Sequence, residues 1–186
     1  MLCDFAEVCG GKLFVSGAGL ALLASPSQTP PYRINVSLAI LGLINLADTD
    51  AQHKLTIELV RVTGSGDTRV TLSDDLPEGA DPRDRGTILI YFMAPRSPEM
   101  MPGDEWSMPM AVPLYGLGLP DLGSYYFSVR IDGREMDRSS FRIVSGQQLA
   151  GRQPDGGGAR GGGTGPSGAG RPREPGAGPP VPDLGV

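Results

Sequence analysis

The stretch Asp121-Leu-Gly-Ser-Tyr-Tyr-Phe127 carries two structural signals. Its second half alternates between two side-chain faces, which is the period of a β-strand with one buried face. Asp121, Gly123 and Tyr125 keep the spacing of a tyrosine corner, in which the phenol hydrogen-bonds to nearby backbone where a strand begins. Phe127 occupies the position at which an antibody-type domain has a cysteine, so we expect a bulky core residue there and no inter-sheet disulfide.

The alternating pattern continues on both sides of this stretch. Val129 and Ile131 extend the same face, and Asp132-Gly133 supplies residues that tolerate the positive φ of a tight hairpin turn. We expect the return strand from about residue 139 to residue 144. Three more alternating stretches are residues 34–40, 55–59 and 68–72, the last two joined by a Gly-rich turn. Together these predict an all-β fold, an immunoglobulin-like two-sheet antiparallel β-sandwich.

Three further segments complete the predicted sheets. Residues 1–8 read as one strand that forms a hairpin with residues 12–15 around Cys9-Gly-Gly11. Residues 87–93 are apolar on both faces, which predicts a central strand. Residues 106–114 have Pro109 and Pro113 on one face. Because proline lacks the N–H that a sheet needs, we expect this strand at an edge or ending early.

The composition changes abruptly after residue 144. Residues 145–186 contain 14 Gly, 7 Pro and no aromatic residue. Such a segment cannot bury enough apolar surface to offset the entropy of ordering itself. We therefore expect one domain over residues 1–144 and a disordered Gly/Pro-rich tail over residues 145–186.

The charge balance excludes two classes of partner. Four of the 16 basic and three of the 21 acidic residues lie in the tail, which leaves 12 and 18 in the domain and a net charge of −6. An acidic domain is repelled by phosphate backbones and anionic lipid, so we expect neither nucleic acid nor membrane as a partner. One Arg160-Gly-Gly in the tail, without stacking aromatic residues, is too little for RNA binding.

The N-terminal region contains an uncharged run, residues 13–25, that looks like the apolar part of an export signal. Asp4 and Glu7 precede it where a signal peptide has net positive charge, so we expect no export and a cytoplasmic protein. The longest other uncharged run, residues 34–47, is too short for a membrane span, which needs about 20 apolar residues. Cys3 and Cys9 are the only cysteines and decide little about compartment; we expect small buried or half-buried thiols.

No catalytic, cofactor or metal signature is present, so the sequence predicts no enzyme and no cofactor. His53 is the only histidine, and any hydrolase would have to depend on it; an exposed histidine at a strand end is the simpler interpretation. The acidic residues of two loops leave Ca²⁺ binding open as an alternative, although no EF-hand spacing occurs. These residues are Asp48, Asp50, Asp74, Asp75, Glu78, Asp81 and Asp84.

Without a catalytic or cofactor signature, the predicted β-sandwich is best interpreted as a scaffold of the kind that is commonly used for binding. The hypothesis is a protein-interaction module that uses a sheet edge or the outward face around Tyr126 and Arg130. A carbohydrate- or Ca²⁺-binding module is the first alternative, because outward tyrosines such as Tyr32, Tyr91 and Tyr115 can stack on sugar rings. A hydrolase dependent on His53 is the second.

Several short motifs resemble an uncharacterised bacterial family of small domains. They are Met1-Leu-Cys-Asp4-Phe-Ala6, Gly11-Lys-Leu-Phe-Val15, Gly17-Ala-Gly19, His53-Lys-Leu-Thr-Ile-Glu-Leu-Val60, Met110-Ala-Val-Pro-Leu114, Gly123-Ser-Tyr-Tyr-Phe127, Ile131-Asp-Gly133 and Phe141-Arg-Ile-Val144. The resemblance covers the domain and stops at the tail. It implies a β-sandwich and a cytoplasmic location. The family has no assigned activity, so the resemblance carries no functional residues over to this chain.

Overall fold

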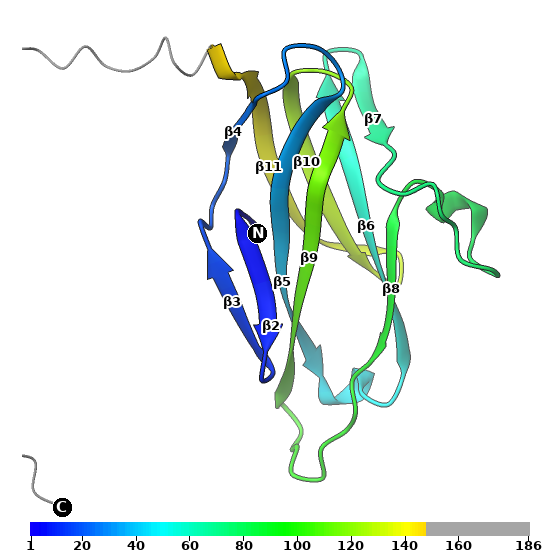
Figure 1. The fold of residues 1–186 in the computed structure, drawn as a ribbon. Coiled ribbons are helices and arrows are strands. Elements are labelled where there is room, and N and C mark those ends of the chain that lie inside the picture. Colours follow the sequence, from blue (N-terminus) through cyan, green and yellow to red (C-terminus); the bar gives the residue numbers. More distant parts are fainter. Residues whose placement is uncertain (148–186) are drawn as a thin grey trace, which may run out of the picture. The chain divides into compact units, whose positions relative to one another are not determined.

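The computed structural model describes residues 1–147, and this part of the chain is all-β (Figure 1). Its strands are β1 (Leu2–Cys3), β2 (Phe5–Cys9), β3 (Lys12–Ser16), β4 (Leu22–Ser25), β5 (Tyr32–Asn45), β6 (Gln52–Thr63), β7 (Gly66–Val70), β8 (Ile88–Met93), β9 (Glu105–Leu119), β10 (Gly123–Ile131) and β11 (Arg134–Ser145). Two single 3-10 turns, η1 (Leu46–Asp48) and η2 (Pro82–Asp84), lie in the connections.

The strands form three sheets. One has the order β1-β5-β9, and a larger one has the order β4-β11-β10-β6-β7, with β8 also paired to β6. The hairpin of β2 and β3 is a small third sheet, which contacts β5 and β9. Pairing is antiparallel except between β4 and β11, which are parallel, so the prediction of a wholly antiparallel arrangement was wrong at this one pair.

The two larger sheets enclose a single core. Alternation on β5, β6, β9, β10 and β11 places every second side chain inside, as the sequence predicts. The buried cluster consists of Leu2, Ile34, Val36, Leu38, Leu55, Ile57, Leu59, Val112, Leu114, Leu119, Tyr125, Phe127, Val129, Phe141 and Ile143. Phe141 packs against both Tyr125 and Phe127, with ring centroids 5.8 and 5.3 Å apart.

Two expected strands differ in the structure. The first eight residues do not form one strand: the chain breaks at Asp4, so that β1 pairs with β5 while β2 turns away to pair with β3. Strand β8 is not central, because it pairs with β6 alone. Although both faces of β8 are apolar, only one of them is packed against the core. Ile90 and Phe92 pack against the core, whereas Tyr91 and Met93 on the opposite face are exposed.

The predicted edge strand is confirmed. Strand β9 pairs with β5 along one side and with no strand of the described residues along the other. At the end of the domain, β11 extends through Ser145, one residue into the predicted tail. The rest of the predicted disordered tail, residues 148–186, lies outside the described residues.

Candidate functional site

The tyrosine-corner residues lie at the start of β10. The hydroxyl of Tyr125 donates a hydrogen bond to the backbone oxygen of Asp121 at 2.7 Å, and the Asp121 N–H donates back to the same hydroxyl at 3.3 Å. Gly123 between them has a φ of 137°, which few residues with a side chain adopt. Tyr125 is buried, and burial raises the pKa of its phenol. The motif thus has a structural role here.

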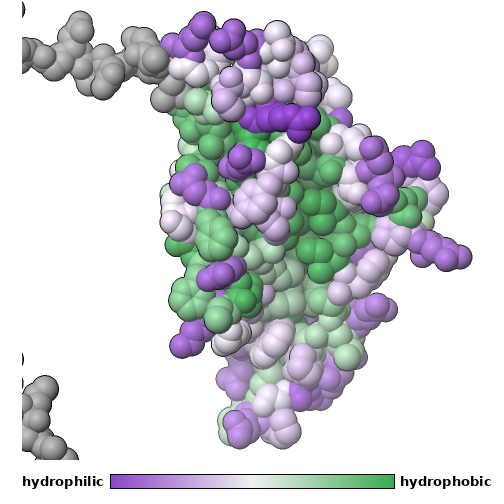
Figure 2. All heavy atoms as spheres, viewed as in Figure 1, coloured by the Kyte–Doolittle hydropathy of each residue, from purple (hydrophilic) through white to green (hydrophobic). Residues whose placement is uncertain are grey.

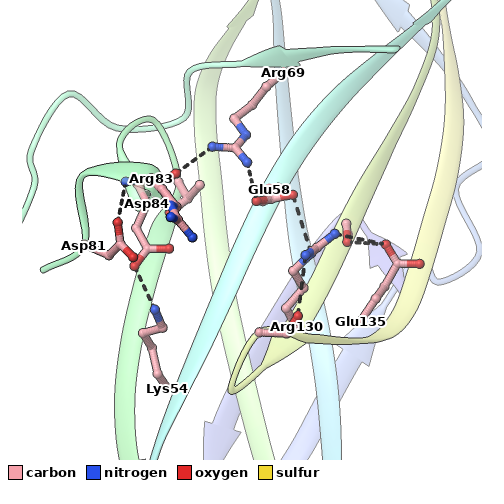
Figure 3. A network of polar contacts seen from close by, with 11 residues as sticks. Lys54, Glu58, Arg69, Asp81, Arg83, Asp84, Arg130 and Glu135 are labelled. Atoms are coloured by element: carbon pink, nitrogen blue, oxygen red, sulfur yellow. Dashed lines mark hydrogen bonds and ion pairs between the residues drawn. The ribbon is translucent and has the colours of Figure 1, made fainter. Parts of the chain in front are cut away.

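The outward face around Tyr126 and Arg130 is occupied by an internal polar network (Figure 3). The carboxylate of Glu58 lies 2.7 Å from the guanidinium of Arg69 and 3.6 Å from that of Arg130 (Figure 3). Glu135 accepts hydrogen bonds from Ser128 at 2.8 Å and from Arg138 at 2.7 Å. The hydrogen bond from Arg138 holds the pKa of the Glu135 carboxyl below its usual range.

Tyr126 itself is held from both sides. Its hydroxyl donates to Asp67 at 3.1 Å, and the guanidinium carbon of Arg138 lies 4.7 Å above its ring. A partner would have to replace these contacts rather than fill vacant positions. The two residues that the sequence proposes for a partner face, Tyr126 and Arg130, therefore both lie on this surface, but each already contacts a side chain of the domain itself.

His53 is not an exposed strand-end residue, contrary to expectation: only 11% of its side chain is accessible. Its Nδ1 lies 2.8 Å from a carboxylate oxygen of Asp132, and its Nε2 lies 2.7 Å from the backbone oxygen of Asp48. Both ring nitrogens thus lie within hydrogen-bond distance of an oxygen of the domain itself, and these contacts raise the pKa of the imidazole. Because both nitrogens are engaged in this way, the geometry does not favour the hydrolase alternative.

Three of the acidic residues of the two loops have contacts of their own. Asp84 pairs with Lys54 at 2.8 Å, Asp81 accepts from the backbone N–H of Arg83, and Asp50 accepts from that of Arg96. In the described residues, no group of three or more His, Cys, Asp or Glu is placed to hold a metal ion. The structure therefore does not bring the Ca²⁺ candidates together.

The remaining sequence candidates are dispersed. Tyr91 and Tyr115 are exposed on two different strands, β8 and β9, and Tyr32 packs against the core. Cys3 is buried and donates to the backbone oxygen of Ser37 at 3.2 Å; burial raises the pKa of its thiol. Cys9 is exposed at the end of β2, which differs from the expected half-buried thiol.

A feature that sequence reasoning did not single out is an open edge of β5. Met1 pairs with Ala39 through two hydrogen bonds: its amino group donates to the Ala39 oxygen at 2.8 Å, and the Ala39 N–H donates to the Met1 oxygen at 3.0 Å. Backbone groups of alternate strand residues point the same way, so those of Leu41 and Leu43 face the same side. Within residues 1–147, β1 is the strand that pairs with this side of β5, and it reaches only to Ala39.

We call residues 41–45 the β5 edge. This segment, Leu-Gly-Leu-Ile-Asn, contains neither a charge nor a proline. Leu41 and Leu43 are exposed to 58% and 57%. A signal for this edge exists in the sequence: the alternation of β5 is lost after Ile40, where apolar residues occupy both faces.

An apolar groove of about 480 Å³ lies along the β5 edge, between β5 and the β10–β11 hairpin. Core side chains of both sheets reach it, and the walls come from β3, β5 and β11. The lining residues are Met1, Leu13, Val15, Leu38, Ala39, Ile40, Leu41, Gly42, Leu43, Val129, Ile131, Met136, Asp137 and Ser139. Asp137 carries the one ionisable side chain among them.

Two other sheet edges, those of β9 and β11, are protected against pairing. Pro109 and Pro113 of β9 lie opposite Leu41 and Ser37, whose backbone groups point away from β9. The two proline nitrogens therefore face the outer side of β9, where an incoming strand would need N–H donors. The outer part of β11 carries charged residues and has a register shift opposite Val129 and Arg130. The β5 edge has none of these devices.

Apolar residues also reach the surface between β9 and β8, in the middle of the face that Figure 2 shows. The partly buried Ile88, Ile90 and Met110 belong to these strands. This strip lies beside the proline-bearing side of β9. On its β9 side, this strip therefore offers apolar contact but a poor backbone template for an added strand.

In the described part of the chain, no helix has the length and the apolar character needed to cross a membrane. No curated protein and no solved structure matches this chain significantly. Residues 1–144, which include every strand described above except the last residue of β11, match the protein family described as Family of unknown function (DUF6941). The chain therefore belongs to this family.

Proposed function

We propose that this protein is a non-enzymatic interaction module, and that it binds an extended segment of another protein as an added strand on the β5 edge. The observation that carries the proposal is the uncharged backbone of residues 41–45, which no strand of the described residues pairs on this side, beside an apolar groove. Strand addition uses main-chain hydrogen bonds for affinity and pockets for alternate side chains for specificity. The β5 edge offers both.

The contrast between edges supports this choice of surface. Natural sheets blunt their free edges with proline, charge or bulges because an open edge invites pairing with other chains. The prolines of β9 and the charged, bulged edge of β11 follow this rule, whereas residues 41–45 do not. Residues 41–45 combine an edge that lacks charge and proline with an apolar groove beside it, and an added partner strand would satisfy both features.

The scaffold is proposed to be immunoglobulin-like. Support comes from the Tyr125–Asp121 contact and from two sheets that enclose one core. A cytoplasmic location and a bacterial source are part of the same proposal, and they rest on the family resemblance and on the acidic residues before the uncharged run. Much of that run forms β3 and β4 of the domain, which also favours a folded rather than a cleaved segment.

Selection of random linear peptides displayed on phage against the full chain tests the proposal. We expect enriched peptides with alternating apolar residues, whose affinity falls at least about tenfold when Leu41→Lys and Leu43→Lys are combined. Tyr115→Lys is the matched control, because Tyr115 is exposed to a similar extent, 59%, on another strand. Failure to enrich any peptide, or equal binding to the double variant, would overturn the proposal.

A further inference from the structure

Gly42 lies in the middle of β5, a 14-residue strand. The backbone conformation and the space around this position do not require a glycine. Its φ is not among the positive values found at the turn glycines. A Cβ added to it would lie 3.4 Å from the terminal carbon of Met108 and 3.7 Å from the Met108 oxygen, which are ordinary contacts. A glycine within a strand weakens it, and often marks a place where a ligand or another backbone approaches closely.

The missing side chain opens the groove. Leu38, Ile40, Gly42 and Ile44 occupy alternate positions of β5 and share its core-facing side. Ile44 is buried against Ala94 and Met108, and Ile40 packs on the main core. Between them, Gly42 lines the groove together with Val129 and Ile131 of the opposite sheet. The space beside Gly42 is therefore apolar and is reached from the β5 edge.

The direction of an added strand follows from β1. β1 is antiparallel to β5, and a strand that continues along the β5 edge in the same direction places one residue directly opposite Gly42. Directly opposite residues share a face of the sheet, so that side chain points into the groove. Its two chain neighbours point outward, beside Leu41 and Leu43.

We propose that the groove beside Gly42 receives one large apolar side chain of the partner strand, so that the site selects uncharged extended segments with an aliphatic or aromatic residue opposite Gly42. This inference rests on the proposed function and names the ligand chemistry of the same site. A charged side chain is disfavoured there, because it loses its hydration among apolar groups. Gly42 is thus a specificity-determining position.

The probe is a peptide series, acetyl-Thr-Val-Thr-Xaa-Thr-amide, with Gly, Ala, Leu, Phe or Glu as Xaa. With Xaa opposite Gly42, the peptide spans the positions opposite residues 45 to 41 and ends before the position that Met1 occupies opposite Ala39. Each peptide is titrated into the isotope-labelled full chain, and the amide signals of Leu41 and Leu43 report the dissociation constant. We expect the Leu and Phe peptides to bind at least about tenfold more tightly than the Gly peptide. The Glu peptide is expected to bind no better than the Gly peptide.

Gly42→Val fills the groove from within. We expect this variant to have a higher thermal midpoint, because valine replaces glycine in a strand, and to bind all five peptides as weakly as wild type binds the Gly peptide. Gly42→Ala is the smaller variant if valine impairs folding, and it should reduce the preference partly. Gly64→Val, in the turn before β7, is the control for replacing a glycine.

The outcomes separate the two proposals. Equal affinity for every Xaa, with the same amides shifted, overturns the inference and leaves strand addition standing. No shift at Leu41 and Leu43 with any peptide overturns both. Sedimentation of wild type as a dimer that the combined Leu41→Lys and Leu43→Lys substitutions dissociate would show that a second copy occupies the edge, and would also overturn the inference.

Discussion

At the scale of single residues, Tyr125 ties the start of β10 to the loop before it. Its side chain is 1% exposed, yet its hydroxyl has two hydrogen bonds to the backbone of Asp121. A buried hydroxyl without partners is costly, so these bonds are what allow a tyrosine to occupy this core position.

Tyr125→Phe keeps the ring and removes both hydrogen bonds. We expect the free energy of unfolding to fall by about 1–2 kcal/mol, measured by urea denaturation. Tyr126→Phe is the matched control: its hydroxyl bonds to Asp67 at the surface, and its loss should change stability by less than about 0.5 kcal/mol. Equal effects of the two substitutions would contradict a structural role for the corner.

His53 is the second residue with a clear role, since it joins the β10–β11 turn to the segment before β6. The hydrogen bond with Asp132 is the main cause that raises the pKa of His53 and lowers the pKa of Asp132. The raised pKa of His53 adds stability that is complete below the ordinary value of 6.5 and is lost as pH rises through the raised value. The lowered pKa of Asp132 adds stability above 3.8 that is lost as pH falls through the lowered value.

The free energy of unfolding should therefore be greatest between these two transitions and should decline as the pH is raised above about 6.5, by less than about 1 kcal/mol for a partly exposed pair. Asp132→Asn is expected to flatten this decline, because asparagine tolerates the φ of 50° at this turn but carries no charge. Urea denaturation at a series of pH values measures both. A decline that survives in Asp132→Asn would assign the pH dependence to other groups.

At the scale of elements, the distribution of prolines and charges along the edges is the informative feature. β9 is a long strand with one side open, and its two prolines each remove a donor on that side. This accounts for residues that otherwise weaken a sheet. It also explains how a long apolar strand remains at an edge.

Replacing both Pro109 and Pro113 by alanine should preserve the fold while restoring two N–H donors on the open side. We expect increased self-association with concentration, measured by sedimentation velocity. The same pair of substitutions at Pro95 and Pro98, in the connection between β8 and β9, serves as control and should have no such effect. A monomeric edge variant would show that apolar packing, rather than proline, keeps this side unpaired.

At the scale of the molecule, the core lies within one domain formed by residues of both larger sheets. The composition of the C-terminal segment predicts that it adds little buried apolar surface. Ending the chain after Gln147 should therefore leave the urea midpoint of the domain unchanged. It should also leave peptide binding at the β5 edge unchanged. A loss of binding on truncation would move the recognition function to residues 148–186.

Patterns local to the chain were enough to predict the individual elements. Alternation identified the inward faces of β5, β6 and β10, Asp132-Gly133 marked the tight turn, and the spacing of Asp121, Gly123 and Tyr125 indicated the corner. These signals are local, because side-chain period and turn conformation depend on residues close together in the chain. The edge position of β9 was also predictable, since proline excludes a central place.

Contacts between distant parts of the chain could be recognised only in the folded protein. His53 and Asp132 are 79 positions apart, and no pattern near either residue announces their contact. The same holds for Glu58 with Arg130, for the edge position of β8, and for the β5 edge, which no strand of residues 1–147 pairs beyond Ala39. Strand order and register arise from the packing of the whole core, so the candidate site, which consists of an unpaired edge and the groove beside it, is visible only once the sheets are assembled.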